Sequence, residues 1–311
     1  MNAQAQRTFL AGSATTPTEG SITGRAMLVD FTVKMWTAAK QDGKVAREIS
    51  DRHGADQKMI RSTRDLIARE DVEELRKVAQ EAAQEHRRRT LPWMDGGIRV
   101  LSSAGYMEYA AAMREYEDRW DRAVADFVTF YPTYVREARR LLGDLYDERD
   151  YPSETRIRDR FAFGYQVFPV PSSADFRVDL GDAETARIKA GIEAGVNDAV
   201  ERAMGDAFKR VVETVGRMAE RLRSYQVVLA PDGKQKAEGV FRDSLVENVR
   251  ELVGILPTLN LTGNKVLAEL TARMERELCQ TSPDTLRVNA RAREEVAAAA
   301  EDILGKMKEY L

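Results

Sequence analysis

Histidine and cysteine, which often carry nucleophilic or acid–base chemistry, are scarce in this chain. It contains His53, His86 and a single cysteine, Cys279. Neither histidine lies beside a serine nucleophile motif, and a structural zinc site needs four Cys or His ligands. The phosphate-binding loop GxxxxGK[ST] and the dinucleotide pattern GxGxxG are absent as well. The sequence therefore predicts no catalytic residue, no metal site and no cofactor, and we expect a protein that is not an enzyme.

A group of carboxylates lies close together near the middle of the chain. Asp144, Asp147, Glu148 and Asp150 carry the oxygen ligands that divalent cations prefer. Their spacing lacks the glycine and the distal glutamate of an EF-hand calcium loop. A solvated helix end explains the group more simply, so we assign no metal ligand to it.

Arginines precede a run of aromatic residues just after this group. The set consists of Arg156, Arg158, Arg160, Phe161, Phe163 and Tyr165. Aromatic faces can stack on bases while guanidinium groups hold phosphates, so these residues are candidates for binding single-stranded nucleic acid. Acidic residues outnumber basic ones over 104–180, however, and a strand that turns its aromatic residues toward the core explains the pattern better.

The composition is typical of a globular protein with an evenly charged surface. Of its 311 residues, 48 are Lys or Arg and 51 are Asp or Glu, so the formal net charge is −3 at pH 7. This balance argues against a polybasic nucleic-acid surface and against a disordered acidic chain. The single cysteine excludes a disulfide framework. The chain shows neither a secretory leader nor a long apolar run, so we expect a cytoplasmic protein without a membrane span.

The N-terminal third is expected to hold a flexible arm and a small folded unit. Residues 1–25 are rich in Ser, Thr, Gly and Ala, which predicts a flexible arm. Alternating β-branched and aromatic residues over 25–38 predict a strand, and a second strand is expected at 98–102. With two short helices between these strands, residues 26–103 are expected to form a small N-terminal α+β unit.

Residues 104–311 are expected to form an extended helical body. Apolar residues spaced three and four apart over 106–146 and 182–223 predict two long amphipathic helices. Pro132 predicts a kink or a break in the first of them. The remaining predictions are a polar loop at 229–239 and helices at 241–256, 265–279 and 290–311.

A β-hairpin is predicted within this body at 161–180. Large apolar residues alternate along the chain on both sides of Pro169 and Pro171, which would supply the loop. A lone two-stranded ribbon is marginally stable in water, so it must pack on another surface. Phe168, Pro169 and Pro171 at its tip are candidate partner-binding residues. The predicted fold class is mostly α with a minor β component (α+β).

Five stretches of the chain resemble an uncharacterised family of bacterial and phage proteins. They are LVDFTVKMWTA at 28–38, RRRTLPWMDGGIRVL at 87–101, LLGDLYDERDYPS at 141–153, FPVPSSADFRVDL at 168–180 and FRDSLVENVRELVGILPTLNLTGN at 241–264. The resemblance implies a phage or prophage origin and a bacterial host cell. Members of that family tend to be encoded near a MoxR-type AAA+ ATPase and a von Willebrand A-type protein that resemble cobaltochelatase subunits. This neighbourhood implies a shared machine and no particular catalytic residue.

Three functions follow from these observations. The first is a phage or prophage scaffold or adaptor that forms a homo-oligomer or docks on a partner such as the AAA+ ATPase or the von Willebrand A-type protein. The second is a single-strand nucleic-acid-binding accessory protein of phage replication or recombination. The third is a membrane-acting protein that inserts its hairpin, which Arg177 and Asp179 disfavour. The long helices and the lack of catalytic motifs favour the scaffold or adaptor.

Overall fold

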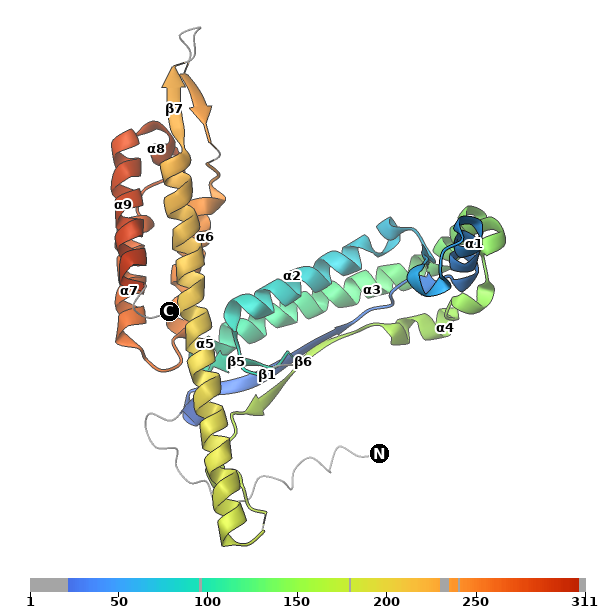
Figure 1. Ribbon diagram of the computed structural model, residues 1–311, viewed down its shortest axis with the longest axis horizontal. Helices are drawn as coiled ribbons and strands as arrows, with labels where there is room; N and C mark the ends of the chain where they lie inside the picture. Colours follow the sequence, from blue (N-terminus) through green and yellow to red (C-terminus); the bar gives the residue numbers. More distant parts are fainter. Residues whose placement is uncertain (1–21, 95–96, 179, 230–234, 240, 308–311) are drawn as a thin grey trace. The chain divides into compact units, whose positions relative to one another are not determined.

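The computed structural model describes residues 22–94, 97–178, 180–229, 235–239 and 241–307. Within these residues the protein is mostly helical with a minor β component, which confirms the predicted fold class (Figure 1). The chain forms two compact units. Unit 1 comprises Met1–Leu28, Thr90–Gly105 and Phe168–Leu311, and unit 2 comprises Val29–Arg89 and Tyr106–Val167. Most of the predicted flexible arm, residues 1–21, lies outside the described residues.

Unit 2 is organised around two helices, α2 (Glu73–Arg89) and α3 (Tyr106–Leu142), which pack side by side (Figure 1). Its shorter elements are β2 (Ala39–Gln41), α1 (Gly43–His53), β3 (Thr63–Asp65) and α4 (Glu154–Ile157). Apolar side chains recur along α3 at helical spacing and meet those of α2, because each helix must bury its apolar stripe. The core that results includes Leu75, Val78, Trp120, Phe127, Tyr131 and Ile157.

Helix α3 is continuous through Pro132, so the predicted break does not occur. Proline removes one backbone hydrogen bond, and packing on both sides of it offsets this loss. Phe127 and Tyr131 are buried before it, Ala138 is buried after it, and the Tyr131 hydroxyl donates a 2.9 Å hydrogen bond to the carbonyl of Pro152. Tertiary contacts therefore hold the helix together across the proline.

Unit 1 is a helical assembly around the 43-residue helix α5 (Asp182–Ser224). Helices α6 (Ser244–Leu259) and α9 (Ala290–Met307) both pack on α5, and α7 (Lys265–Leu278) packs on α6 and α9 (Figure 1). The short helix α8 (Pro283–Val288) precedes α9. The shared core is aliphatic and includes Val211, Val215, Met218, Leu256, Leu267 and Ile303.

Strands make up a small part of the fold. The largest sheet has the order β4-β5-β1-β6 and consists of β4 (Leu91–Pro92), β5 (Arg99–Ser102), β1 (Ala26–Lys34) and β6 (Ala162–Pro169). Strand β2 pairs with β3, and β7 (Gln226–Leu229) pairs with β8 (Gln235–Glu238), both in antiparallel fashion. Strand β8 lies within the polar loop predicted at 229–239, because a short polar strand carries no clear alternation.

The predicted hairpin at 161–180 is wrong in its second strand. Residues 162–169 form β6, whose neighbour in the sheet is β1, and the described residues after Pro169 contain the 3-10 turn η8 (Ser173–Asp175) and no strand before α5. Pro169 and Pro171 cannot donate backbone hydrogen bonds, so the chain leaves the sheet there. The alternation of Val178 and Leu180 buries neither residue, since both side chains are exposed.

The two units also differ from the predicted division at residue 103. The chain passes from unit 1 to unit 2 near residue 28, returns for residues 90–105, leaves again and returns at residue 168. Hydrophobic periodicity shows which segments are helical and which face is apolar. It does not show which other segment covers that face, so the grouping into units was beyond the sequence.

Candidate functional site

The segment between β6 and α5 exposes apolar side chains and contains the predicted partner-binding residues. Phe168 is 40% exposed, Pro169 and Pro171 are exposed, and Val170 between the prolines is buried. Further along, Val178 and Leu180 are 56% and 52% exposed. Val170 therefore anchors the segment to unit 1 while its neighbours face solvent.

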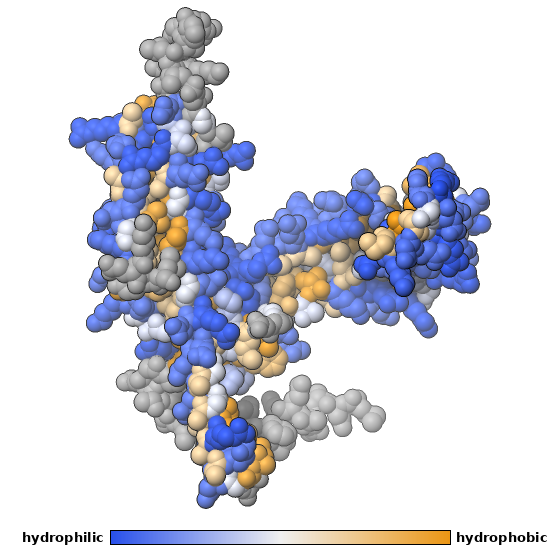
Figure 2. Space-filling model, viewed as in Figure 1, coloured by the Kyte–Doolittle hydropathy of each residue, from blue (hydrophilic) through white to orange (hydrophobic). Residues whose placement is uncertain are grey.

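The first half of helix α5 continues this exposed region. Among the described residues, none from 182 to 198 is buried, and the first buried side chain of the helix is Ala199. At 1.5 Å per residue, this exposed part of α5 is about 25 Å long. Ile188, Ile192 and Val196 form a half-buried stripe along it at spacings of four residues. Figure 2 shows apolar residues, in orange and tan, around this end of the helix.

A groove of about 510 Å³ lies where the exposed segment runs beside α5. Pro171 lines it together with Ile192, Val196 and Val200. The Ser173 hydroxyl donates a 2.6 Å hydrogen bond to Oε1 of Glu193, which ties η8 to the helix. We call the whole region the α5 apolar surface; it consists of Phe168, Pro169, Pro171, Val178, Leu180, Ile188, Ile192 and Val196.

The candidate nucleic-acid residues fall into two groups in unit 2. Arg156, Arg158 and Arg160 are exposed on α4 and the turn that follows it. Phe161 and Phe163 instead pack on the core, with ring centroids 6.3 Å and 6.1 Å from that of Trp120.

Tyr165 packs in the same way. Its ring lies edge-on to the buried ring of Tyr109 at 5.3 Å. All three aromatic rings therefore support the core, and the arginines do not share a base-stacking platform with them.

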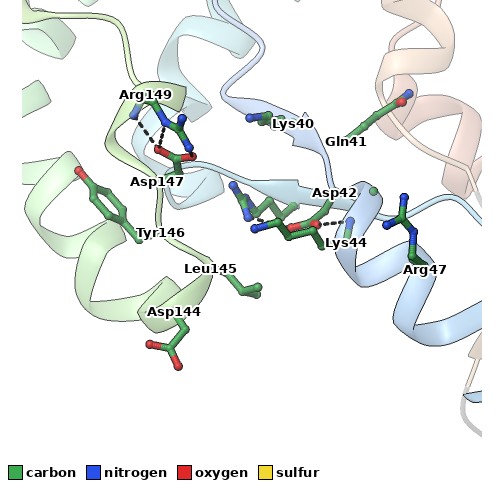
Figure 3. A pocket seen from close by; sticks show the side chains of 12 residues that line it. Lys40, Gln41, Asp42, Lys44, Arg47, Asp144, Leu145, Tyr146, Asp147 and Arg149 are labelled. Carbon is green, nitrogen blue, oxygen red and sulfur yellow. Dashed lines mark hydrogen bonds and ion pairs between the residues drawn. The ribbon is translucent and has the colours of Figure 1, made fainter. Parts of the chain in front are cut away.

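A polar cavity of about 560 Å³ in unit 2 gathers charged residues that are far apart in the sequence (Figure 3). One wall is the start of α1, where the Asp42 carboxylate accepts hydrogen bonds from the backbone N–H groups of Lys44 and Val45, both at 3.1 Å. The other wall is the segment 144–149, where Arg149 pairs with Asp147 at 2.8 Å. Lys44 and Arg47 line the cavity and are exposed.

A network of ion pairs lies beneath this cavity. Nη1 of Arg64 donates to Asp42 at 2.8 Å and Nη2 donates to Asp150 at 2.6 Å, while Lys40 also pairs with Asp150. The hydrogen bond from the backbone of Val45 lowers the pKa of Asp42, and the hydrogen bond from Lys40 lowers the pKa of Asp150. Both carboxyls are therefore ionised at neutral pH and are unsuited to act as general acids.

The network also accounts for two members of the carboxylate group noticed in the sequence. Asp147 and Asp150 are partners of Arg149, Arg64 and Lys40. In the part of the chain that the structure describes, no cluster of three or more His, Cys, Asp or Glu side chains is arranged to hold a metal ion. Most cations of the cavity are thus paired with carboxylates, and these ion pairs join β2, β3 and the segment before α4.

His86 and Cys279 lie in buried surroundings. Nδ1 of His86 is 2.9 Å from the Tyr109 hydroxyl, and its ring lies 5.1 Å from that of Phe31. Burial raises the pKa of the Tyr109 hydroxyl and of the Cys279 thiol, so neither ionises near neutral pH. These contacts are those of packed core residues.

No family model, curated protein or solved structure matches the chain. The resemblance to the phage and bacterial family therefore stays a prediction. None of the described helices has the length and apolar character needed to cross a membrane.

Proposed function

We propose that the protein is a non-enzymatic scaffold that assembles with a second copy of itself through the α5 apolar surface. The observation that carries this proposal is the concentration of exposed apolar side chains on one segment, next to a half-buried apolar stripe on the adjacent half of a long helix. Large exposed apolar patches on soluble proteins mark interaction sites, because contact with water makes them costly. Phe168, Val178 and Leu180 are the largest contributors.

The order of apolar and charged residues along α5 favours a second copy of this chain as the partner that binds the α5 apolar surface. Pairs of identical chains usually meet about a two-fold axis, so each position faces its symmetric counterpart. In an antiparallel pair centred on Ala190, Ile188 of one copy would meet Ile192 of the other. Arg187 and Glu193, three residues to either side of Ala190, would bring opposite charges together beside this apolar contact. The residues within three positions of Ala190 are thus self-complementary in both apolar side chains and charge.

The wider role that we propose is that of a phage or prophage adaptor in the bacterial cytoplasm. The sequence resemblance supports this role, and it names a MoxR-type AAA+ ATPase or a von Willebrand A-type protein as the partner on which the assembled scaffold docks. The self-association is the part of the proposal that the exposed residues support directly.

Light scattering coupled to size-exclusion chromatography tests the self-association. We expect the wild-type mass to rise with concentration to that of a dimer or a larger oligomer, and Leu180→Asp or Phe168→Ala to shift it toward the monomer. Burying a leucine contributes about 1.5–3 kcal/mol. Because each residue of a two-fold interface occurs twice, Leu180→Asp should raise the dissociation constant about 100-fold or more.

Val288→Asp is the matched control for this experiment. Val288 is 85% exposed at the end of α8 and lies outside the α5 apolar surface, so its replacement should leave the mass unchanged. A wild-type protein that stays monomeric at every concentration would overturn the proposal, and so would an equal loss of assembly in Val288→Asp.

A further inference from the structure

A second polar cavity, in unit 1, is lined by cationic side chains. It has a volume of about 500 Å³ and lies between the last third of α5 and the start of α6. Arg217 and Arg221, one helical turn apart on α5, line it together with Arg242, which lies two residues before α6. The rest of the lining is Ser244, Leu245 and Asn248, from the first turns of α6. None of these described lining residues is acidic.

None of the three arginines forms an ion pair with a carboxylate in the described part of the chain. Nε of Arg217 donates to the carbonyl of Glu213 in its own helix at 3.1 Å, which leaves its charge uncompensated. In the described part of the chain, the guanidinium groups of Arg221 and Arg242 form no hydrogen bond or ion pair. All three side chains are exposed and thus able to reorient toward a ligand.

Acidic residues next to this cavity in the sequence are paired with other cations. Glu213 lies 3.8 Å from Lys209, Glu247 pairs with Arg250 at 2.8 Å, and Asp243 pairs with Arg287. Glu220 is adjacent to Arg221 and lies three residues from Arg217 on α5, and in the described part of the chain it forms no ion pair with either. Among the described residues, these carboxylates therefore form no ion pair with the three arginines that line the cavity.

The start of α6 adds a favourable field for an anion. Asp243 precedes the helix, yet its side chain forms no capping hydrogen bond there. The first turn of a helix carries partial positive charge, and it lies here beside three arginines and the polar groups of Ser244 and Asn248. The cavity of unit 2 differs, because Asp42 caps the helix at that site and most of its cations are paired.

We propose that Arg217, Arg221 and Arg242 form a binding site for the diphosphate group of a small ligand. Guanidinium groups form paired hydrogen bonds with phosphate oxygens, and three of them match the charge of about −3 that a diphosphate group carries. The group can belong to inorganic pyrophosphate or to a nucleoside diphosphate, both of which present the same oxygens. This site is separate from the α5 apolar surface, so it stands independently of the proposed self-assembly.

Isothermal titration calorimetry with pyrophosphate and with ADP, at constant ionic strength, tests the site. We expect saturable binding of pyrophosphate to the full-length protein and at least about tenfold weaker binding in Arg221→Gln and in Arg242→Gln, since each removes a charge-assisted contact. Tighter binding of ADP than of pyrophosphate would show that the diphosphate group bound by the site belongs to a nucleotide. Equal binding would show that the diphosphate alone is recognised.

Arg202→Gln provides a matched control on the same helix. Nε of Arg202 donates to the carbonyl of Asp198 at 3.3 Å, as Nε of Arg217 does to Glu213, but Arg202 does not line the cavity. Its replacement should leave the affinity for pyrophosphate within about twofold of wild type, and circular dichroism should show that all variants are folded. The proposal is overturned if wild type shows no saturable binding, or if Arg202→Gln weakens binding as much as Arg221→Gln does.

Discussion

Replacing Trp120 by alanine should destabilise unit 2 by about 3–5 kcal/mol, the range for removing a large aromatic side chain from a core. Trp120 is fully buried on α3 and lies against Phe161, just before β6, and Phe163 within β6. The smaller side chain leaves a cavity that these rings cannot fill without leaving their own contacts. A loss of this size is a large part of the total stability of an ordinary domain.

Urea unfolding followed by circular dichroism measures the effect of Trp120→Ala. Met107→Ala is the matched control, because Met107 lies on the same helix and is 70% exposed. Trp120→Phe keeps part of the buried area and should fall between wild type and Trp120→Ala. If Trp120→Ala unfolds at the same urea concentration as Met107→Ala, the assignment of Trp120 to the centre of this core is wrong.

Replacing Asp150 by asparagine should cost about 3 kcal/mol at pH 7, the lower end of the range for breaking a buried ion pair. The Asp150 side chain is only 4% exposed and receives both Arg64 and Lys40. Without the charge of Asp150, Arg64 keeps its ion pair with Asp42 in a largely buried setting. Lys40 is half exposed and regains water, which is why we place the effect at the lower end.

The same ion pairs predict how stability depends on pH. The pKa of Asp42 and the pKa of Asp150 are lowered in the folded state, so both groups stabilise the fold above the ordinary carboxyl pKa of about 4. This stabilisation is lost as the pH falls below about 4 through the lowered values. Thermal melts between pH 7 and pH 3 should therefore show a smaller loss of stability in Asp150→Asn than in wild type.

Asp65→Asn controls for the removal of any carboxylate near this region. Asp65 pairs with Arg69 at 2.8 Å, and both side chains are well exposed, so the pair contributes little. Its replacement should leave the melting curve at pH 7 nearly unchanged. An equal loss of stability in the two variants would show that the network under the cavity has no special role.

The helices were the part of the fold that the sequence predicted best. The apolar stripe of α5 spans ten turns and more, so its period is unmistakable, and its predicted end at 223 lies one residue from the observed one. Strand β1 likewise lies within the predicted 25–38. A long apolar stripe predicts a helix correctly even where it contains a residue such as Pro132, because many apolar contacts together stabilise the helix.

Charged sites were harder to predict because their members come from distant segments. Asp150 was noticed only as part of a carboxylate group, and its partners Lys40 and Arg64 lie 110 and 86 residues away. Arg217 and Arg221 are visible in the sequence as neighbours on one helix face. Arg242 joins them only through the packing of α6 on α5, which periodicity alone does not specify.

The alternating route of the chain between the two units has a consequence for synthesis on the ribosome. All residues of unit 2 have been made once Val167 has emerged, whereas unit 1 still lacks every residue from Phe168 onward. The core that contains strand β5 and the start of β1 is complete only after α5 to α9 have been synthesised. Synthesis from the N-terminus therefore favours folding of unit 2 before unit 1. A chain whose synthesis stops within α5 would contain a complete unit 2 and an incomplete unit 1 with an exposed apolar core.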